Sequence, residues 1–80
     1  MDLKPVATEK AVKLVDVENT LTFETSRNVR KPALKKEIEM LFKVKVSSVR
    51  TLIKKNKKIA YIRLAKGYAA ADVATKMGMI

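Results

Sequence analysis

The chain has 80 residues, of which 48% are hydrophobic and 5% aromatic, and its 18 Lys or Arg residues against 8 Asp or Glu give a formal net charge of +10. A chain of this length is expected to form one domain over residues 1–80, and its apolar content is too high for a disordered basic tail. It contains no Cys and no His, which excludes disulfides and removes the commonest metal ligand and general base.

The first predicted element is a short helix over residues 8–16. Pro5 favours an extended entry before it, with a short extra strand at residues 3–6 as an option. Thr8 is expected to be the N-cap, and Glu9 to lie in the first turn at the positive end of the helix dipole. The expected buried face of this helix consists of Ala11, Val12 and Val15.

A half-buried strand follows at residues 20–24, where Leu21 and Phe23 alternate with polar residues. Residues 26–28 are predicted to form a loop. Pro32 suits the first turn of a second helix, where its missing N–H costs nothing. The core-facing stripe of this helix is predicted to consist of Leu34, Ile38, Leu41 and Phe42.

A β-hairpin is predicted from two alternating runs, residues 49–53 and 59–65, joined by a five-residue basic tip. Its first strand either begins after Ser47 or carries a bulge, because Val44 and Val46 are out of phase with Val49. On the return strand one face is predicted to carry Ala60, Ile62 and Leu64, and the other Ile59, Tyr61 and Arg63.

The last predicted helix has a stripe of Ala70, Val73, Ala74 and Met77, and Gly78 is a natural stop. The predicted order α-β-α-β-β-α is typical of the α+β class: a small antiparallel or mixed sheet of three to four strands covered by helices, an α/β sandwich. No apolar run approaches the ~20 residues that span a bilayer, so a cytoplasmic protein without membrane insertion is expected.

The positive charge is concentrated in the middle of the chain. Between Arg27 and Lys66 there are fourteen basic residues and two acids, a net charge of +12, whereas the flanks sum to −2. Self-repulsion of this size opposes folding and is relieved when a polyanion neutralises it. Nucleic acid is therefore the first candidate partner.

Two clusters dominate this basic region. One lies at the hairpin tip and consists of Lys54, Lys55, Lys57 and Lys58. The other lies around the start of the second helix and consists of Arg27, Arg30, Lys31, Lys35 and Lys36. Each suits phosphate contact, although a solvated turn protected by lysines is the ordinary alternative for the tip. Arg50 and Arg63 are expected to extend this surface.

The sequence argues against catalysis. Without His or Cys, acid–base chemistry would fall to carboxylates, lysines, Tyr61 and Tyr68, and Glu37 and Glu39 do not face each other on a helix. We expect no enzyme, no catalytic residue, no metal site, no cofactor and no small-molecule substrate. Tyr61 either stacks on a base or packs under a helix, and packing is the favoured interpretation.

The sequence resembles, in order and over nearly its whole length, the family of the twenty-third protein of the large ribosomal subunit. The segments that carry the resemblance are PVATEKA at residues 5–11, NTLTF at 19–23, KKEI at 35–38, LFKVKVSSVRT at 41–51 and KKIAYIRL at 57–64.

The resemblance implies a structural constituent of the large subunit that binds ribosomal RNA beside the exit of the nascent-chain tunnel. Its implied partners are large-subunit ribosomal RNA, neighbouring ribosomal proteins, and the signal recognition particle or protein-conducting channel. It makes Glu9 a docking residue, a role compatible with its place at the helix dipole. It also adds three residues at the start of the chain to the RNA-binding set, which becomes Lys4, Thr8, Lys10, Arg27, Arg30, Lys31, Lys35, Lys36, Arg50, Lys54, Lys55, Lys57, Lys58 and Arg63.

The hairpin departs from one branch of the family. Bacterial members carry a long basic hairpin loop that reaches into the tunnel, whereas only five residues separate Ile53 from Ile59 here. The short hairpin argues against contact with the tunnel wall. Together with the lack of a basic N-terminal extension of the eukaryotic kind, it favours an archaeal form.

Two alternatives stay open from the sequence. A stand-alone DNA-coating or RNA-binding protein would bind duplex DNA as tightly as folded ribosomal RNA and would not travel with large subunits. A peripheral membrane module would bind anionic vesicles at physiological salt, but no exposed apolar helix face accompanies the basic surface.

Overall fold

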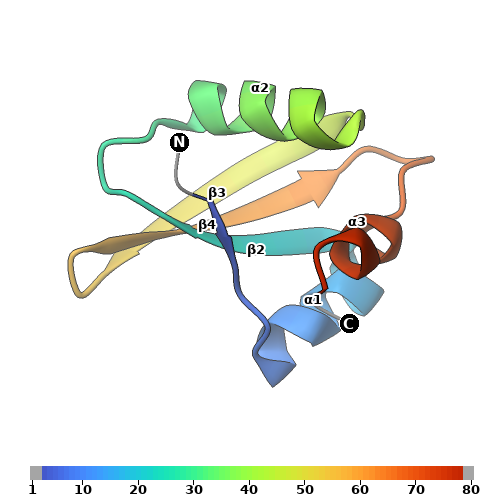
Figure 1. Ribbon diagram of the computed structural model, residues 1–80, viewed down its shortest axis with the longest axis horizontal. Helices are drawn as coiled ribbons and strands as arrows, with labels where there is room; N and C mark the ends of the chain where they lie inside the picture. Colours follow the sequence, from blue (N-terminus) through green and yellow to red (C-terminus); the bar gives the residue numbers. More distant parts are fainter. Residues whose placement is uncertain (1–2, 79–80) are drawn as a thin grey trace.

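The computed structural model describes residues 3–78, which form three helices and four strands (Figure 1). In chain order these are β1 (Lys4–Pro5), α1 (Glu9–Glu18), β2 (Thr20–Thr25), α2 (Lys31–Phe42), β3 (Val46–Lys54), β4 (Lys57–Leu64) and α3 (Ala70–Lys76). This order confirms the predicted succession. The optional strand predicted at residues 3–6 is present as the two residues of β1.

The four strands form one sheet in the order β1-β2-β4-β3, and every pairing in it is antiparallel. β2 and β4 therefore lie inside the sheet, while β3 and the short β1 lie at its edges. The α+β class is confirmed, and the sheet is antiparallel rather than mixed. An antiparallel arrangement lets β3 and β4 pair directly through a short turn, without a crossover connection.

The β3–β4 hairpin is tighter than predicted. Lys54 pairs with Lys57, so the connecting turn contains only Lys55 and Asn56. Both turn residues have positive φ, +49° and +64°, as a type I′ turn requires. The predicted five-residue tip was too long because apolar alternation ends at Ile53, whereas backbone pairing continues beyond it.

The start of β3 resolves the uncertainty about its register. The strand begins at Val46, and its pairing with β4 shifts between Val46 and Ser48. Of the two predicted alternatives, the bulge is therefore confirmed. The extra residue restores Val49 to the phase in which it lies opposite Ile62.

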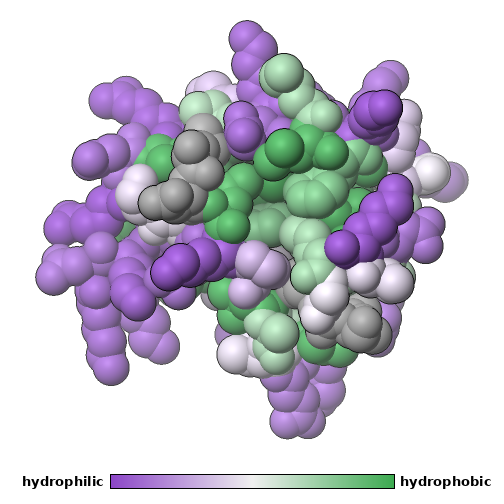
Figure 2. Space-filling view, in the orientation of Figure 1, coloured by the Kyte–Doolittle hydropathy of each residue, from purple (hydrophilic) through white to green (hydrophobic). Residues whose placement is uncertain are grey.

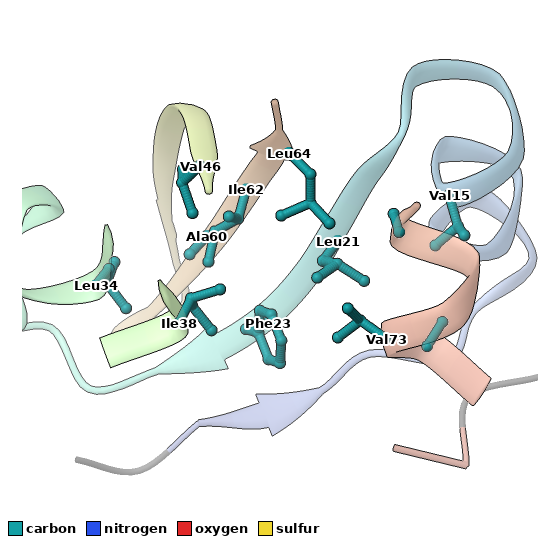
Figure 3. Packing of buried hydrophobic residues seen from close by; sticks show 12 residues of the cluster. Val15, Leu21, Phe23, Leu34, Ile38, Val46, Ala60, Ile62, Leu64 and Val73 are labelled. Atoms are coloured by element: carbon teal, nitrogen blue, oxygen red, sulfur yellow. The ribbon is translucent and has the colours of Figure 1, made fainter. Parts of the chain in front are cut away.

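The hydrophobic core lies on the face of the sheet under α2 and α3, and Val15 of α1 also belongs to it. Its floor is formed by β2 and β4, whose inward apolar residues are 0–3% exposed, and Figure 3 shows the helix side chains pointing toward that floor. The pattern predicted for β4 is confirmed, as are the inward positions of Leu21 and Phe23 in β2. The prediction that β2 is half-buried was wrong, because Thr20 and Thr22 on its other face are 1% and 3% exposed. The core side chains in this layer include Leu21, Phe23, Leu34, Ile38, Ala60, Ile62, Leu64, Ala70, Val73 and Ala74.

One residue of the predicted α2 stripe was assigned wrongly. Leu41 is 57% exposed, whereas Leu34 and Ile38 are fully buried and Phe42 is half-buried. The Phe42 ring stacks on that of Phe23, with the centroids 6.5 Å apart and an interplanar angle of 22°. The contact therefore follows the i, i+4, i+8 ridge, which is inclined to the helix axis, and Leu41 lies beside that ridge.

The ends of α1 and α3 follow their predicted signals. Thr8 is the N-cap of α1, and its Oγ1 accepts a hydrogen bond of 3.2 Å from the Ala11 N–H. α1 continues two residues beyond the predicted end at residue 16. α3 ends at Lys76, and Gly78 follows with a φ of +75°, which confirms the predicted stop.

Asn19 connects three elements. It ends α1 in the left-handed conformation, with a φ of +52°. Its Nδ2 donates to the Tyr68 carbonyl at 2.7 Å, and its Oδ1 accepts from the Ala70 N–H at 2.6 Å. Its own carbonyl accepts from the Leu64 N–H at 3.1 Å. Because the N-cap of α3 makes no side-chain cap hydrogen bond, Asn19 caps that helix from a distance.

We therefore expect two substitutions of Asn19 to distinguish the stability that comes from its side-chain hydrogen bonds from the cost of the left-handed backbone conformation. Asn19→Gly should lower the free energy of unfolding by about 2 kcal/mol, since two hydrogen bonds to partly buried backbone groups are lost. Asn19→Ala should cost about 1 kcal/mol more, because alanine is disfavoured in the left-handed region. Urea denaturation followed by circular dichroism measures both. If the two variants are equally stable, the left-handed conformation does not disfavour alanine as expected. If Asn19→Gly is as stable as the unchanged protein, the two side-chain hydrogen bonds do not contribute to stability.

Candidate nucleic-acid interface

The two basic clusters predicted from the sequence lie against each other in the structure. Arg27 Nη1 donates to Asn56 Oδ1 at 3.2 Å, and Lys58 Nζ donates to the Val29 carbonyl at 2.6 Å. These contacts join the loop before α2 to the hairpin. We call the resulting surface the basic end, and its cations are Arg27, Lys54, Lys55, Lys57, Lys58 and, as shown next, Lys4. Arg30 and Lys31 follow this loop in the chain, at the start of α2.

Lys4 reaches the basic end from β1. It lines a hollow of about 210 Å³ together with Ser26 of the loop before α2 and with Asn56 and Lys57 of the hairpin. Figure 2 shows hydrophilic side chains gathered where Figure 1 places the hairpin turn and the loop before α2. Three segments distant in the sequence thus contribute cations to one end of the molecule.

The four tip lysines do not have equal freedom. Lys57 Nζ lies 3.1 Å from Glu24 Oε1, and the Lys58 ammonium is held by the Val29 carbonyl. Within residues 3–78, neither hydrogen bonds nor salt bridges to protein groups are found for the exposed side chains of Lys54 and Lys55. Lys58 therefore fastens the hairpin to the loop before α2, and Lys54 and Lys55 are the lysines most available to an external anion.

The entrance of α2 combines cations with unpaired backbone donors. Arg30 is the N-cap and makes no side-chain cap hydrogen bond, and no acid lies in the first turn. Lys31 and Lys35 line a shallow hollow of about 420 Å³ with Ser47 and Ser48 of β3. Lys36 is exposed on the same helix. Free N–H groups and cations at a helix N-terminus favour an anion.

A second group of predicted RNA-binding residues lies elsewhere. Arg50 and Arg63 project from the sheet face opposite the core, which we call the open face: Arg50, Leu52, Ile59, Tyr61 and Arg63, carried by β3 and β4. Lys10 of α1 lines a hollow on this face together with Arg50. The structure therefore divides the predicted set between the basic end and the open face.

Tyr61 lies on the open face, beside α1. It is half-buried on the open face and does not belong to the core cluster under α2 and α3. The guanidinium carbon of Arg50 lies 5.8 Å from the centroid of its ring, a cation–π distance. The register of β4 sends residue 61 away from α2 and α3, and on the open face it lines the same hollows as Lys10 and Leu14 of α1. Packing beside a helix, here α1, therefore stays the favoured interpretation.

Two residues at the start of α1 were assigned roles by resemblance. Thr8 serves as the N-cap of α1 through its hydroxyl. This contribution to the fold is sufficient to explain a threonine at position 8. Glu9 is exposed in the first turn. Figure 1 shows α1 and α2 on opposite sides of the sheet, so Glu9 is carried by a different part of the molecule from the basic helix entrance.

Other kinds of site find little support in the described part of the chain. In residues 3–78 no three acidic side chains are gathered where they could hold a metal ion. None of the helices there combines the length and the hydropathy needed to cross a bilayer.

A comparison with known protein families agrees with the resemblance seen in the sequence. The model of the family described as ribosomal protein L23 matches residues 1–76, which include the start of α1, the whole of α2 and the complete hairpin. Members of this family are components of the large ribosomal subunit in the cytoplasm. Because the match covers nearly all of its 80 residues, this chain belongs to the ribosomal protein L23 family and is a structural constituent of the large ribosomal subunit.

Proposed function

We propose that this chain binds large-subunit ribosomal RNA through its basic end, near the exit of the nascent-chain tunnel, and that α1 presents Glu9 to targeting factors. The observation that carries the RNA contact is the joining of the hairpin tip to the entrance of α2 by the Arg27–Asn56 and Lys58–Val29 hydrogen bonds. These bonds hold the cations of two separate segments on one rigid surface. A rigid array loses less conformational entropy on binding than flexible side-chain clusters do.

Three basic residues stand where folding favours another residue type. Lys55 has a φ of +49° in a turn that favours Asn or Gly. Arg30 is an N-cap without a side-chain cap hydrogen bond, where Ser, Thr, Asp or Asn would stabilise the helix. Lys31 lies in a first turn that favours acids. Residues that are locally unfavourable for folding are typical of functional surfaces. All three side chains are cations that would attract the phosphates of an RNA backbone.

The mechanism is phosphate neutralisation by a small, preorganised surface. Lys54 and Lys55 extend from the turn, while the unpaired N–H groups at the start of α2 add directional donors. Contacts of this kind set position and orientation without reading bases. In double-stranded RNA they follow the shape of the A-form backbone. Lys35, Lys36 and the cations of the open face extend the same contact to a second RNA segment.

The opposite side of the molecule is suited to protein partners. On α1 the exposed acids Glu9 and Asp16 balance the exposed Lys10 and Lys13, so this helix is less basic than the hairpin. We place the signal recognition particle or the protein-conducting channel there, with neighbouring ribosomal proteins on the remaining surface. No catalytic group or cofactor takes part in this function. The two-residue hairpin turn supports a short, archaeal type of hairpin that does not line the tunnel.

Salt dependence tests the RNA contact. The affinity of the chain for refolded large-subunit RNA should fall steeply between about 50 and 200 mM KCl, since counterions are released on binding. Lys54→Gln with Lys55→Gln should reduce the slope of log K against log salt by roughly 1.4 to 1.8. The matched control is Lys13→Gln with Lys76→Gln, which removes the same charge from α1 and α3. Equal slopes for both double variants, or equal affinity for duplex DNA, would refute the proposal.

In the same assay, the double variant Lys57→Gln with Lys58→Gln should change the salt slope only slightly but should be less stable. Because Glu24 and the Val29 carbonyl already hold these ammonium groups, the salt slope should change less than for Lys54 and Lys55. The free energy of unfolding should fall instead, by about 1 kcal/mol for the lost Lys58 hydrogen bond. Urea denaturation checks the stability, and a full loss of slope without destabilisation would contradict the fastening role.

Lys55→Asn should separate folding from binding at one residue. Asparagine accepts the left-handed conformation of the turn, so the free energy of unfolding should rise by up to about 1 kcal/mol. RNA affinity at low salt should fall at the same time, because one phosphate-facing charge is lost. Thermal unfolding and filter binding measure the two effects. A variant that is more stable and binds equally well would show that the tip is a solvated turn.

Docking at Glu9 is tested on assembled particles. Large subunits carrying Glu9→Lys should bind the signal recognition particle less tightly in co-sedimentation, while the affinity of the chain for ribosomal RNA is not reduced. Asp16→Lys is the matched control, because it reverses an exposed acid on the same helix. Equal losses for both variants would indicate a general charge effect. No loss for either would remove Glu9 from the interface.

A further inference from the structure

The open face carries a row of three side chains that are in register across three strands. Thr22 of β2 lies opposite Tyr61 of β4, and Tyr61 lies opposite Arg50 of β3. Directly opposed residues in antiparallel strands project from the same face and are near neighbours. The row thus sets a hydroxyl, an aromatic ring and a guanidinium side by side.

A groove runs beside this row, between α1 and the hairpin. It consists of two hollows of about 420 and 260 Å³ that share Lys10, Leu14 and Tyr61 as lining residues. Each is of the order of a small-ligand pocket, typically ~300–1,000 Å³. The groove also includes Leu52, a large apolar side chain that is 50% exposed.

The hydroxyl of Thr22 is a second observation in favour of a ligand, separate from the Tyr61 ring. It is only 3% exposed and lines the smaller hollow, and its Oγ1 is the buried side-chain polar atom of residues 3–78 for which no hydrogen-bond partner is found. A buried hydroxyl without a partner is unfavourable. A ligand that offers it a donor or acceptor would recover the missing interaction.

The charges of the groove favour an anionic ligand. Lys10, Arg50 and Lys54 line it, against a single acid, Glu18. Glu18 lies 4.0 Å from Arg50, and their side chains are 45% and 67% exposed, so this pair is weak and open to competition. Lys54 also belongs to the basic end, which makes the groove continuous with the phosphate-binding surface.

An aromatic ring, apolar walls and a cationic rim together match a nucleotide better than a peptide. Unpaired bases stack on tyrosine rings and on guanidinium planes, while their phosphates require cations. We propose that the groove holds one unpaired nucleotide of an RNA loop. Its base lies against Tyr61 and Arg50, a polar group of the nucleotide pairs with Thr22, and its phosphate lies beside Lys10 or Lys54. This inference rests on the proposed RNA-binding function and names a second contact within it.

The test uses a short single-stranded oligoribonucleotide with one central 2-aminopurine, and a matched oligonucleotide with an abasic site at that position. Binding to the full chain should quench the 2-aminopurine fluorescence. Tyr61→Leu should weaken binding by about 5- to 150-fold, and the abasic site should weaken binding of the unchanged protein similarly. Tyr61→Leu should cause no further loss on the abasic oligonucleotide. Tyr61→Phe, which keeps the ring, should retain most of the affinity.

Two further variants separate this contact from structural effects. Thr22→Val should weaken binding several-fold without lowering the thermal unfolding midpoint, since it removes a hydroxyl that has no protein partner. Lys55→Gln should lower the salt slope but leave the quenching intact. If Tyr61→Leu does not fold, the abasic oligonucleotide and Thr22→Val carry the test with folded proteins.

The outcomes distinguish this inference from the function on which it rests. If large-subunit RNA binds with a steep salt slope but the Tyr61 and abasic changes have no effect, the nucleotide site is refuted and the RNA-binding function stands. If the chain binds no ribosomal RNA at all, the proposed function itself fails. If an acidic amphipathic peptide shifts the Tyr61 amide resonance and the oligoribonucleotide does not, the groove is a protein-docking site and the inference is overturned.

Discussion

The structure depends on the register of β4 between β2 and β3. Because side chains alternate along a strand, this register sends Ala60 and Ile62 into the core and Tyr61 and Arg63 to the open face. A slip of one residue would exchange the two faces and place a guanidinium under α2 and α3. The bulge between Val46 and Ser48 keeps β3 in the matching phase. One pairing therefore sets both the core and the chemistry of the surface behind it.

The distribution of charge follows from where this small core lies. The helices cover the sheet behind the hairpin turn, so the last residues of the hairpin extend beyond the apolar layer and are exposed. Cations are tolerated there because their ammonium groups stay in water. Two of them also support the fold: Lys57 pairs with Glu24, and Lys58 fastens the loop before α2. The proposed RNA contact and the fold thus depend on the same short segment.

The contacts that we propose would let one small domain meet RNA phosphates, an unpaired nucleotide and a protein factor. The basic end suits phosphates held at fixed positions, whereas the groove beside Tyr61 suits a base taken out of a helix. Glu9 lies on α1, the helix whose Lys10 and Leu14 form one wall of that groove. The basic end and the groove share Lys54 of the hairpin, so the two proposed RNA contacts adjoin each other.

Much of the fold could be read from periodicity, capping residues and charge. The inward residues of β2 and β4, the Thr8 cap and the i, i+4 line of α2 follow local patterns, and each was confirmed at the position predicted. The half-exposure predicted for β2 was wrong, because its other face is buried as well. Local patterns failed where a partner element decides the outcome. Leu41 fits the helical stripe of α2, but the inclination of that helix on the sheet leaves it in water.

The sequence by itself determined the class of the fold, the family and the two basic clusters, because these depend on residue type and spacing along the chain. Only the tertiary structure decided that the clusters form one surface, that Lys58 faces a backbone carbonyl, and that Thr22, Tyr61 and Arg50 stand in a row. Contacts such as Arg27–Asn56 join residues 29 positions apart in the chain. They arise from strand register and helix placement, which follow from packing of the whole core and not from any local pattern of residues.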